Sequence, residues 1–311
     1  MIQVALVGIG KIAKDQHIPA IQTSEEWDLA ATVSRVGTVE GVQSFTDFDA
    51  MLQSRPEIRV VSLCVPPVPR FEYAAAAIRA KRHVMLEKPP GATLSECQAL
   101  LNLAQENRVS VYATWHSREA AMVATAKAWL AKKPLKRMHV TWKEDVRRWH
   151  PGQDWIWQPG GMGVFDPGIN ALSIVTEILT DPIHLREATL EVPENLQAPI
   201  AAQLSFYHPH RAEVSADFDW RQDGDQHWTI EAETDDGLLR LTNGGADLHI
   251  NGDQIAPSQT GTTLEGEYPR LYANMARLVA RGEIDMDLSP MRHVADAFTL
   301  GRRNLVEPFY E

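Results

Sequence analysis

The chain has 311 residues, 44% of them hydrophobic, and a formal net charge of −11. This near-average composition excludes disordered, collagenous and fibrous classes, and the length predicts two domains. Acidic residues outnumber basic ones and no Lys/Arg block stands apart, so the chain is not expected to bind nucleic acid through bulk charge. It shows no apolar run of membrane-spanning length and only two cysteines, Cys64 and Cys97, and we do not expect its first residues to be a signal peptide. We therefore expect a reduced, soluble, cytoplasmic protein without a disulfide framework.

Strand-like and helix-like segments alternate through the first third of the chain. The predicted strands are residues 2–7, 29–33, 59–65, 83–87 and 109–113, and the predicted helices are 12–22, 47–53, 71–80 and 94–107. Strands that alternate with helices need crossover connections, which make neighbouring strands parallel. Their almost continuous hydrophobicity fits a sheet covered on both faces. The sequence therefore predicts an α/β fold that begins with a doubly wound parallel sheet.

The pattern changes near Ser117. Further helices are predicted at residues 119–132, 167–179, 268–280 and 290–304, with a strand at 138–145 and several more between 185 and 250. Asp-Gly or Asn-Gly pairs at residues 223–224, 236–237 and 243–244 are hairpin signals, so this second sheet should be mostly antiparallel. We expect two domains, residues 1–117 and 118–311.

A glycine turn, Gly8-Ile9-Gly10-Lys11-Ile12-Ala13, follows the first strand and opens a helix. This is the G-x-G-x-x-A form of the dinucleotide fingerprint, in which Gly8 permits the turn and Gly10 lets backbone amides approach a pyrophosphate. The alternative, a plain strand–helix turn, explains the spacing less well. The candidate cofactor contacts here are Gly8, Gly10, Lys11, Ile12 and, at the end of a neighbouring strand, Pro66.

The end of the second strand bears on the choice of dinucleotide. An NAD site usually places Asp or Glu there, whereas this chain has Ser34 and Arg35. No carboxylate repels a 2′-phosphate, while a hydroxyl and a guanidinium can bind one. We therefore expect NADP to be preferred and NAD to be tolerated; the alternative is that Arg35 is a surface charge.

Leu86-Glu87-Lys88-Pro89-Pro90, together with the glycine turn, resembles the glucose–fructose oxidoreductase/inositol dehydrogenase (Gfo/Idh/MocA) family. The matching blocks are residues 8–17, 85–93, 113–118 and 142–173. The resemblance implies a Rossmann domain that binds NADP or NAD, followed by an α/β domain with a large open sheet for substrate binding and homodimer formation. It is strongest toward bacterial sugar 1-dehydrogenases, which implies oxidation of a cyclic aldose at C1 to the lactone, L-arabinose first and D-galactose second.

Lys88 lies at the carboxyl end of a predicted parallel strand, where doubly wound sheets place their ligands. The resemblance implies that Lys88 contacts the substrate near the nicotinamide. We expect Glu87 and the bend at Pro89 to aim Lys88, and both Glu87 and Lys88 are also candidate cofactor contacts. Asp166 and Asn170 match the family's second motif, except that Asn replaces the usual His. Asn cannot accept the C1 hydroxyl proton, so the acceptor is Asp166, Lys88 or a water, and we favour Asp166. The competing role for Asp166, directly before Pro167, is a helix cap.

The candidate sugar contacts are Glu144, His150, His116 and Trp149. Polar groups there can bind ring hydroxyls, and an aromatic face can pack on sugar C–H groups. The other tryptophans of this region, Trp142, Trp155 and Trp157, are expected in the core or as loop anchors. His17 is expected to be structural, and the histidines lack the convergent acids of a metal site.

Two alternatives remain open from sequence: a different sugar or inositol oxidoreductase of the family, and a non-catalytic sensor that binds NAD(P). The presence of both Lys88 and Asp166 argues against the sensor. A hydrophobic outer face of the second sheet would fit the expected homodimer.

Overall fold

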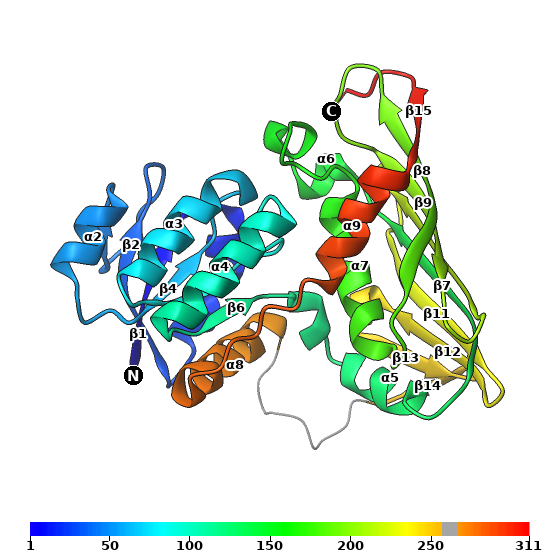
Figure 1. Cartoon of the computed structure of the whole chain (residues 1–311), viewed down its shortest axis with the longest axis horizontal. Helices are drawn as coiled ribbons and strands as arrows, with labels where there is room; N and C mark the ends of the chain where they lie inside the picture. Colours follow the sequence, from blue (N-terminus) through cyan, green and yellow to red (C-terminus); the bar gives the residue numbers. More distant parts are fainter. Residues whose placement is uncertain (257–265, 311) are drawn as a thin grey trace. The chain divides into compact units, whose positions relative to one another are not determined.

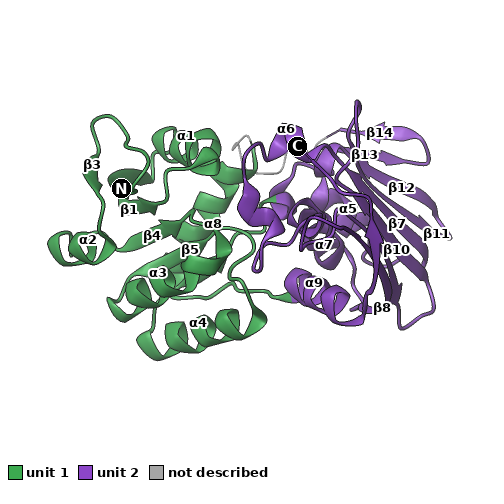
Figure 2. Ribbon diagram, turned by 90° about the horizontal axis from the view of Figure 1, so that it is seen from above, with its two compact units in different colours: residues 1–116, 262–288 green, residues 117–261, 289–311 purple. Residues whose placement is uncertain are grey.

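The computed structural model describes residues 1–256 and 266–310. Contacts divide the chain into two compact units, Met1–His116 with Thr262–Leu288, and Ser117–Gly261 with Ser289–Glu311 (Figure 2). The first break lies one residue from the expected boundary. The contacts group residues 266–288 with the first unit, whereas the sequence-based division places them in the second domain.

The first unit is built on a parallel sheet with the strand order β3-β2-β1-β4-β5-β6 over its described residues (Figure 1). Its strands are β1 (Ile2–Val7), β2 (Trp27–Val33), β3 (Gln43–Phe45), β4 (Val60–Leu63), β5 (His83–Leu86) and β6 (Val111–Ala113). The short edge strand β3 is the one that the hydrophobic pattern did not predict. Both β2 and β4 pair with β1, so the strand order reverses direction between β1 and β4. Open α/β sheets bind ligands at such a switch point, beside the carboxyl ends of the strands.

Four helices connect these strands: α1 (Ile18–Gln22), continuous with the π-helical turn η1 (Ala13–His17), α2 (Phe48–Ser54), α3 (Pro67–Arg79) and α4 (Leu94–Asn107). The helix α3 begins four residues before its predicted start because proline is compatible with a first helical turn, where its missing N–H is not needed. Side chains cap the first turns of α2 and α4. Asp47 accepts a hydrogen bond from the N–H of Ala50 at 2.6 Å, and Thr93 accepts one from the N–H of Glu96 at 3.2 Å.

The helix α8 (Glu267–Arg281) brings the distant segment back to the first unit. Its buried residues Leu271, Tyr272 and Met275 share a hydrophobic cluster with Val4 and Met85 of the parallel sheet. Its amphipathic sequence predicts that one face is buried, but such a pattern does not say against which sheet. The assignment to the first unit therefore depends on tertiary packing.

The second unit is built on a mostly antiparallel sheet, with the order β14-β13-β12-β11-β7-β10-β9-β8-β15 over its described residues. Its strands are β7 (Leu135–Lys143), β8 (His184–Pro193), β9 (Ala201–Tyr207), β10 (Glu213–Asp219), β11 (His227–Thr234), β12 (Gly237–Thr242), β13 (Asp247–Ile250), β14 (Asp253–Ile255) and β15 (Arg302–Val306). Only the β7/β10 and β8/β15 pairs are parallel among those described. The predicted fold class is confirmed in both units.

Two local predictions for this sheet are wrong. The Asp223-Gly224 pair does not form a hairpin, because β7 lies between the strands β10 and β11 that it connects. The last predicted helix ends at Leu300, and residues 302–306 form a strand that pairs with β8. The break falls at Gly301, where a Cβ would lie 2.4 Å from the carbonyl oxygen of Ala297. The helical spacing of apolar residues continues to residue 304 in the sequence, so it did not indicate this end. The close contact at Gly301 exists only in the folded chain.

The second unit also contains four helices, α5 (Val123–Leu130), α6 (Val146–Trp149), α7 (Phe165–Ile178) and α9 (Ser289–Leu300), and the short 3-10 turns η3 (Asp154–Trp157) and η4 (Asn243–Gly245). A further 3-10 turn, η2 (His116–Glu119), begins at the last residue of the first segment of the first unit. The helix α7 lies close to the sheet because Gly168 faces Phe218 of β10: a Cβ at this glycine would meet the ring at 2.7 Å. Phe165 adds an edge-on contact with the same ring, at 6.0 Å between centroids.

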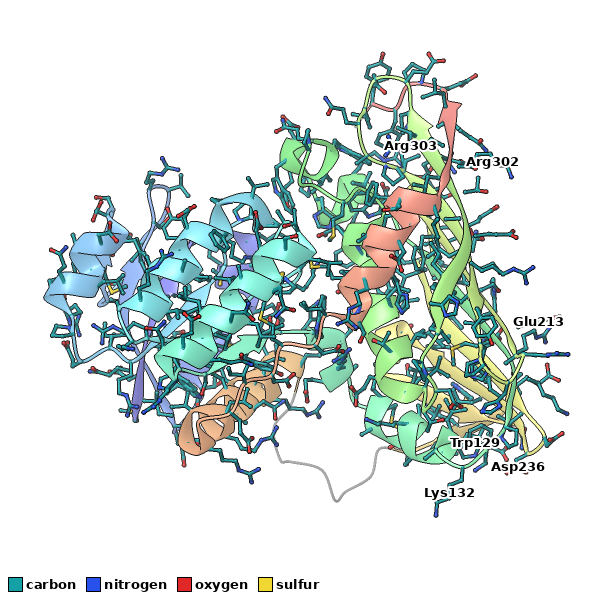
Figure 3. The ribbon with its side chains drawn as sticks, in the orientation of Figure 1. Trp129, Lys132, Glu213, Asp236, Arg302 and Arg303 are labelled. Carbon is teal, nitrogen blue, oxygen red and sulfur yellow. The ribbon has the colours of Figure 1, made fainter. Side chains whose placement is uncertain are left out.

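Over the described residues, the other face of the second sheet is polar and lacks the hydrophobic surface that would fit the expected homodimer. Cross-strand pairs cover its centre: Lys143 with Asp217 at 2.5 Å, and His139 with the hydroxyl of Ser215 at 2.9 Å. Figure 3 shows further charged side chains along this sheet, among them Glu213 and Arg302. The alternation of buried and less buried residues along each strand produces this division. Within the described ranges, no helix is long and apolar enough to cross a membrane.

Candidate functional site

The glycine turn has the geometry that its sequence predicts. Gly8 follows β1 with φ of +89°, and a Cβ there would lie 2.9 Å from the Val65 side chain and 3.0 Å from the Val65 nitrogen. Both the torsion and the contact demand glycine. At Gly10 a Cβ would meet nothing within 4 Å, so this exposed position at a helix start is open to a ligand. An open glycine at the first strand–helix turn, beside the β1/β4 switch point, fits a dinucleotide pyrophosphate.

The remaining predicted cofactor contacts lie around the same edge of the sheet. Lys11 is exposed and forms an ion pair with Asp15 one turn later, while Ile12 is half-buried. Arg35, directly after β2, is exposed; the Ser34 hydroxyl accepts a hydrogen bond from the N–H of Val36 at 3.2 Å. Pro66, exposed at the end of β4, precedes α3.

Glu87 is buried, with 4% of its surface exposed, and its carboxylate is turned into the protein. One oxygen accepts hydrogen bonds from Nε2 of His17 at 2.9 Å and from the Tyr268 hydroxyl at 2.8 Å. The other accepts from the backbone N–H of Lys88 at 3.0 Å. The Glu87 side chain therefore fixes the backbone at Lys88 by accepting its N–H.

Arg70 holds the same turn from another side, and sequence analysis missed it. This guanidinium from α3 is 3% exposed and donates to the carbonyl oxygens of Glu87, Pro89 and Val65. It thereby links the end of β4 to the turn that contains Lys88. The sequence did not predict that Arg70 is buried, because long basic side chains in a helix usually remain at the surface.

Charge is concentrated around Glu87. Burial by itself would raise the pKa of Glu87, but the hydrogen bond and positive charge of His17, together with the Tyr268 hydroxyl, lower it to about 2. Burial disfavours the charged form of His17 as well, yet its contacts with Cys64, Tyr272 and the Glu87 carboxylate raise its pKa well above the usual value. Glu87 and His17 thus form a buried ion pair.

His116, a predicted sugar contact, belongs to the first unit. Its Nδ1 lies 2.5 Å from a carboxylate oxygen of Glu267, and its ring stacks on Tyr268 at 5.8 Å between centroids. Burial works against protonation, but the charge and hydrogen bond of Glu267 raise the pKa of His116. The structure therefore pairs this residue with Glu267 of α8, which favours its protonated form.

In the second unit, Glu144 follows β7 and is 6% exposed. Each of its carboxylate oxygens accepts an indole N–H, from Trp220 at 3.1 Å and from Trp228 at 2.8 Å. Sequence analysis missed both tryptophans, which lie 76 and 84 residues further along the chain. Their side-chain type was the only signal, and their contact with Glu144 depends on the pairing of β7 with β10 and β11.

Asp166 and His150 lie together, with Oδ2 of Asp166 3.4 Å from Nε2 of His150. Asp166 is 3% exposed, and the His150 ring packs edge-on against Trp220 at 5.2 Å. The helix α7 begins at Phe165 after Val164, so Asp166 is its second residue. The cap interpretation of Asp166 is therefore wrong.

Asn170 is half-buried on α7, four residues after Asp166, and positions four apart share one helix face. Trp149 is half-buried at the end of α6; its indole donates to Gln226 at 3.3 Å, and its ring contacts that of Trp228 at 5.5 Å. Of the other tryptophans in this region, Trp142 and Trp157 are buried as expected, and Trp155 is half-buried.

Glycines allow the loop before α7 to pack closely. A Cβ at Gly163 would lie 2.2 Å from the carbonyl oxygen of Pro199, and one at Gly161 would lie 2.3 Å from that of Trp155. This close packing sets the start of the helix that carries Asp166. In the part of the chain that the structure describes, no group of three His, Cys, Asp or Glu side chains is arranged to hold a metal ion.

Comparisons with known proteins agree with the fold of both units. Residues 2–114 match the Gfo/Idh/MocA model, described as an oxidoreductase family with an NAD-binding Rossmann fold. The whole chain is 41% identical over 310 residues to galactose 1-dehydrogenase of Pseudomonas fluorescens and spans 99% of that protein. It is 54% identical to the crystal structure of D-galactose-1-dehydrogenase protein from Rhizobium etli, with a TM-score of 0.94 and coverage of 99% and 98% of the two chains.

A more distant solved structure shares the fold alone. The 3-ketoreductase KijD10 from Actinomadura kijaniata, in complex with TDP-benzene and NADP, has a TM-score of 0.81 at 16% identity, over 98% of this chain and 99% of that one. The full-length match at 41% identity and the glycine turn together show that the chain belongs to the Gfo/Idh/MocA family of oxidoreductases, with an NAD-binding Rossmann fold as its first unit.

Proposed function

We propose that the protein is an aldose 1-dehydrogenase that oxidises L-arabinose and D-galactose at C1 to the lactone, with NADP preferred over NAD. The observation that carries the proposal is the pairing of Asp166 with His150 at 3.4 Å. A buried carboxylate beside an imidazole can accept a hydroxyl proton. The names of the two galactose dehydrogenases support the choice of sugar.

The reaction removes a hydride from C1 and a proton from its hydroxyl, and leaves the C1 carbonyl of a lactone. The bound dinucleotide supplies the hydride acceptor. We assign Asp166 as the proton acceptor, with His150 stabilising its carboxylate at Oδ2. Asn170 can donate a hydrogen bond to the C1 oxygen, and we assign the Lys88 ammonium to the same oxygen.

Glu144 and Trp149 are assigned to sugar binding. The two indole N–H donors hold the Glu144 carboxylate in one orientation, which suits an acceptor for sugar hydroxyls. The Trp149 ring offers an apolar face for the sugar C–H groups. We also assign His116, held by Glu267, as a donor to the sugar.

A panel of aldoses tests this function. With NADP present, L-arabinose and D-galactose are expected to produce reduced cofactor, with kcat/KM values that differ by less than about 200-fold, because a pocket discriminates weakly against one extra carbon group. Absorbance at the wavelength of the reduced nicotinamide measures the rate. Tight NADP binding without turnover of any sugar or inositol would instead identify a sensor. Turnover of other sugars alone would identify a different oxidoreductase of the family.

The preference for NADP is assigned to Ser34 and Arg35. The variant Arg35→Ala is expected to raise the KM for NADP by about 10–100-fold, the effect of losing a hydrogen bond between charged groups. The KM for NAD should remain within about twofold and serves as the internal control, because NAD lacks the 2′-phosphate. An equal effect on both cofactors would reject the assignment.

We further propose a homodimer formed through the open face of the second sheet. Because that face carries paired charges such as Lys143 and Asp217, association would depend on polar contacts and weaken with salt. Sedimentation of the protein at low and high salt tests this proposal, and a monomer in both conditions would contradict it.

A further inference from the structure

The buried hydrogen bonds around Glu87 extend well beyond the turn that carries Lys88. His17, fully buried, lies between two partners: Nε2 is 2.9 Å from Glu87, and Nδ1 is 2.8 Å from the hydroxyl of Tyr272. Tyr268 reaches the same Glu87 oxygen at 2.8 Å. One carboxylate therefore receives donors from three segments of the chain, the third being the Lys88 backbone.

These segments are far apart in sequence. His17 ends the π-helical turn that follows the glycine fingerprint, and such irregular turns are frequent at functional sites. Glu87 directly follows β5, and Tyr268 lies in the first turn of α8. The network thus connects the helix of the dinucleotide fingerprint to the turn that carries Lys88, through side chains of the first unit alone.

A buried carboxylate is costly unless its oxygens accept hydrogen bonds. With His17 protonated, both ring nitrogens donate, Nε2–H to Glu87 and Nδ1–H to Tyr272. Three other groups surround the His17–Glu87 pair. The hydroxyl of Ser62, in β4, lies 3.4 Å from Nδ1 of His17, and the others are Cys64, directly after β4, and His116. The arrangement leaves the Glu87 carboxylate one orientation, in which its second oxygen faces the N–H of Lys88.

We propose that Tyr268 and His17 are positioning residues: they hold the Glu87 carboxylate, and through it the backbone N–H of Lys88, so that the Lys88 side chain is presented to the sugar. Neither residue needs to touch the substrate. The inference rests on the proposed function, in which the Lys88 ammonium binds the C1 oxygen of the sugar. A merely structural network would affect stability without affecting Lys88.

Tyr268→Phe tests the inference, because it removes one hydroxyl and keeps the ring. Tyr112→Phe is the matched control: Tyr112 is buried in the same hydrophobic cluster, but its hydroxyl accepts from Asn274 at 3.4 Å rather than serving Glu87. Tyr268→Phe is expected to lower kcat about tenfold, the loss of a hydrogen bond to a charged group, with the KM for NADP unchanged. Tyr112→Phe should leave both within about twofold.

A second measurement needs neither sugar nor cofactor. In protein labelled with 15N-lysine, the amide of Lys88 is identified by its absence in Lys88→Arg protein labelled in the same way. Its hydrogen exchange is expected to be about tenfold faster in Tyr268→Phe and unchanged in Tyr112→Phe. If Tyr268→Phe does not fold, Glu87→Gln is measured instead, with faster exchange again expected.

The two measurements separate the inference from the function on which it rests. Faster exchange at Lys88 supports the positioning network even if the wild-type protein oxidises no sugar, a result that would reject the proposed function alone. Unchanged exchange overturns the inference. The double variant gives a second test. If Tyr268 acts through Lys88, adding Tyr268→Phe to Lys88→Ala should not lower kcat further, so a further tenfold loss would also overturn the inference.

Discussion

Replacing Asp166 with asparagine is expected to lower kcat by about 10³-fold, within the range of a lost general base. The side chain keeps its size, but an amide cannot accept the C1 hydroxyl proton. His150, at 3.4 Å, would then face an amide in place of the carboxylate with which it pairs. Initial rates of cofactor reduction with D-galactose or L-arabinose measure the loss, and the affinity for NADP should be unchanged.

Glu177→Gln is the matched control for this variant. Glu177 lies on the same helix and pairs with Lys127 at 2.6 Å, so its loss removes a carboxylate from α7 without altering the proposed acceptor. Its kcat should remain within about twofold of the wild-type value. A near-normal kcat for Asp166→Asn would reject Asp166 as the proton acceptor and leave Lys88 or a water for that role.

Replacing Arg70 with methionine is expected to lower the free energy of unfolding by about 3 kcal/mol or more, because unsatisfied buried acceptors cost roughly 1–3 kcal/mol each. The guanidinium serves the carbonyl oxygens of Val65, Glu87 and Pro89. Methionine fills a similar length without any donor. Urea denaturation followed by tryptophan fluorescence measures the change.

Arg79→Met provides the comparison, since Arg79 lies exposed on the same helix α3. A surface substitution of this kind should change the free energy of unfolding by less than about 0.5 kcal/mol. Equal stability of Arg70→Met and Arg79→Met would show that the Lys88 turn does not depend on the buried guanidinium.

Much of the first unit was predictable because its signals are local. The alternation of apolar strands with helices predicted the parallel sheet, and the torsion and contact at Gly8 are those that a fingerprint glycine needs. The predictions failed where the decisive contact lies far away in sequence. The helix α8 has a buried face, but only its packing on Val4 and Met85 assigns it to the first unit.

The sequence by itself determined the candidate site residues: Lys88, Asp166, Glu144 and His150 each stand out by type and motif. Only the tertiary structure decided which of them meet. Asp166 and His150 form a pair, Glu144 is held by Trp220 and Trp228, and Lys88 is held by Glu87 and Arg70. The physical reason is that a motif records the backbone needs of a few neighbouring residues. Hydrogen bonds in a buried site instead join groups from different strands, helices and loops, up to 84 residues apart for Glu144 and Trp228, and the sequence carries no period that marks them.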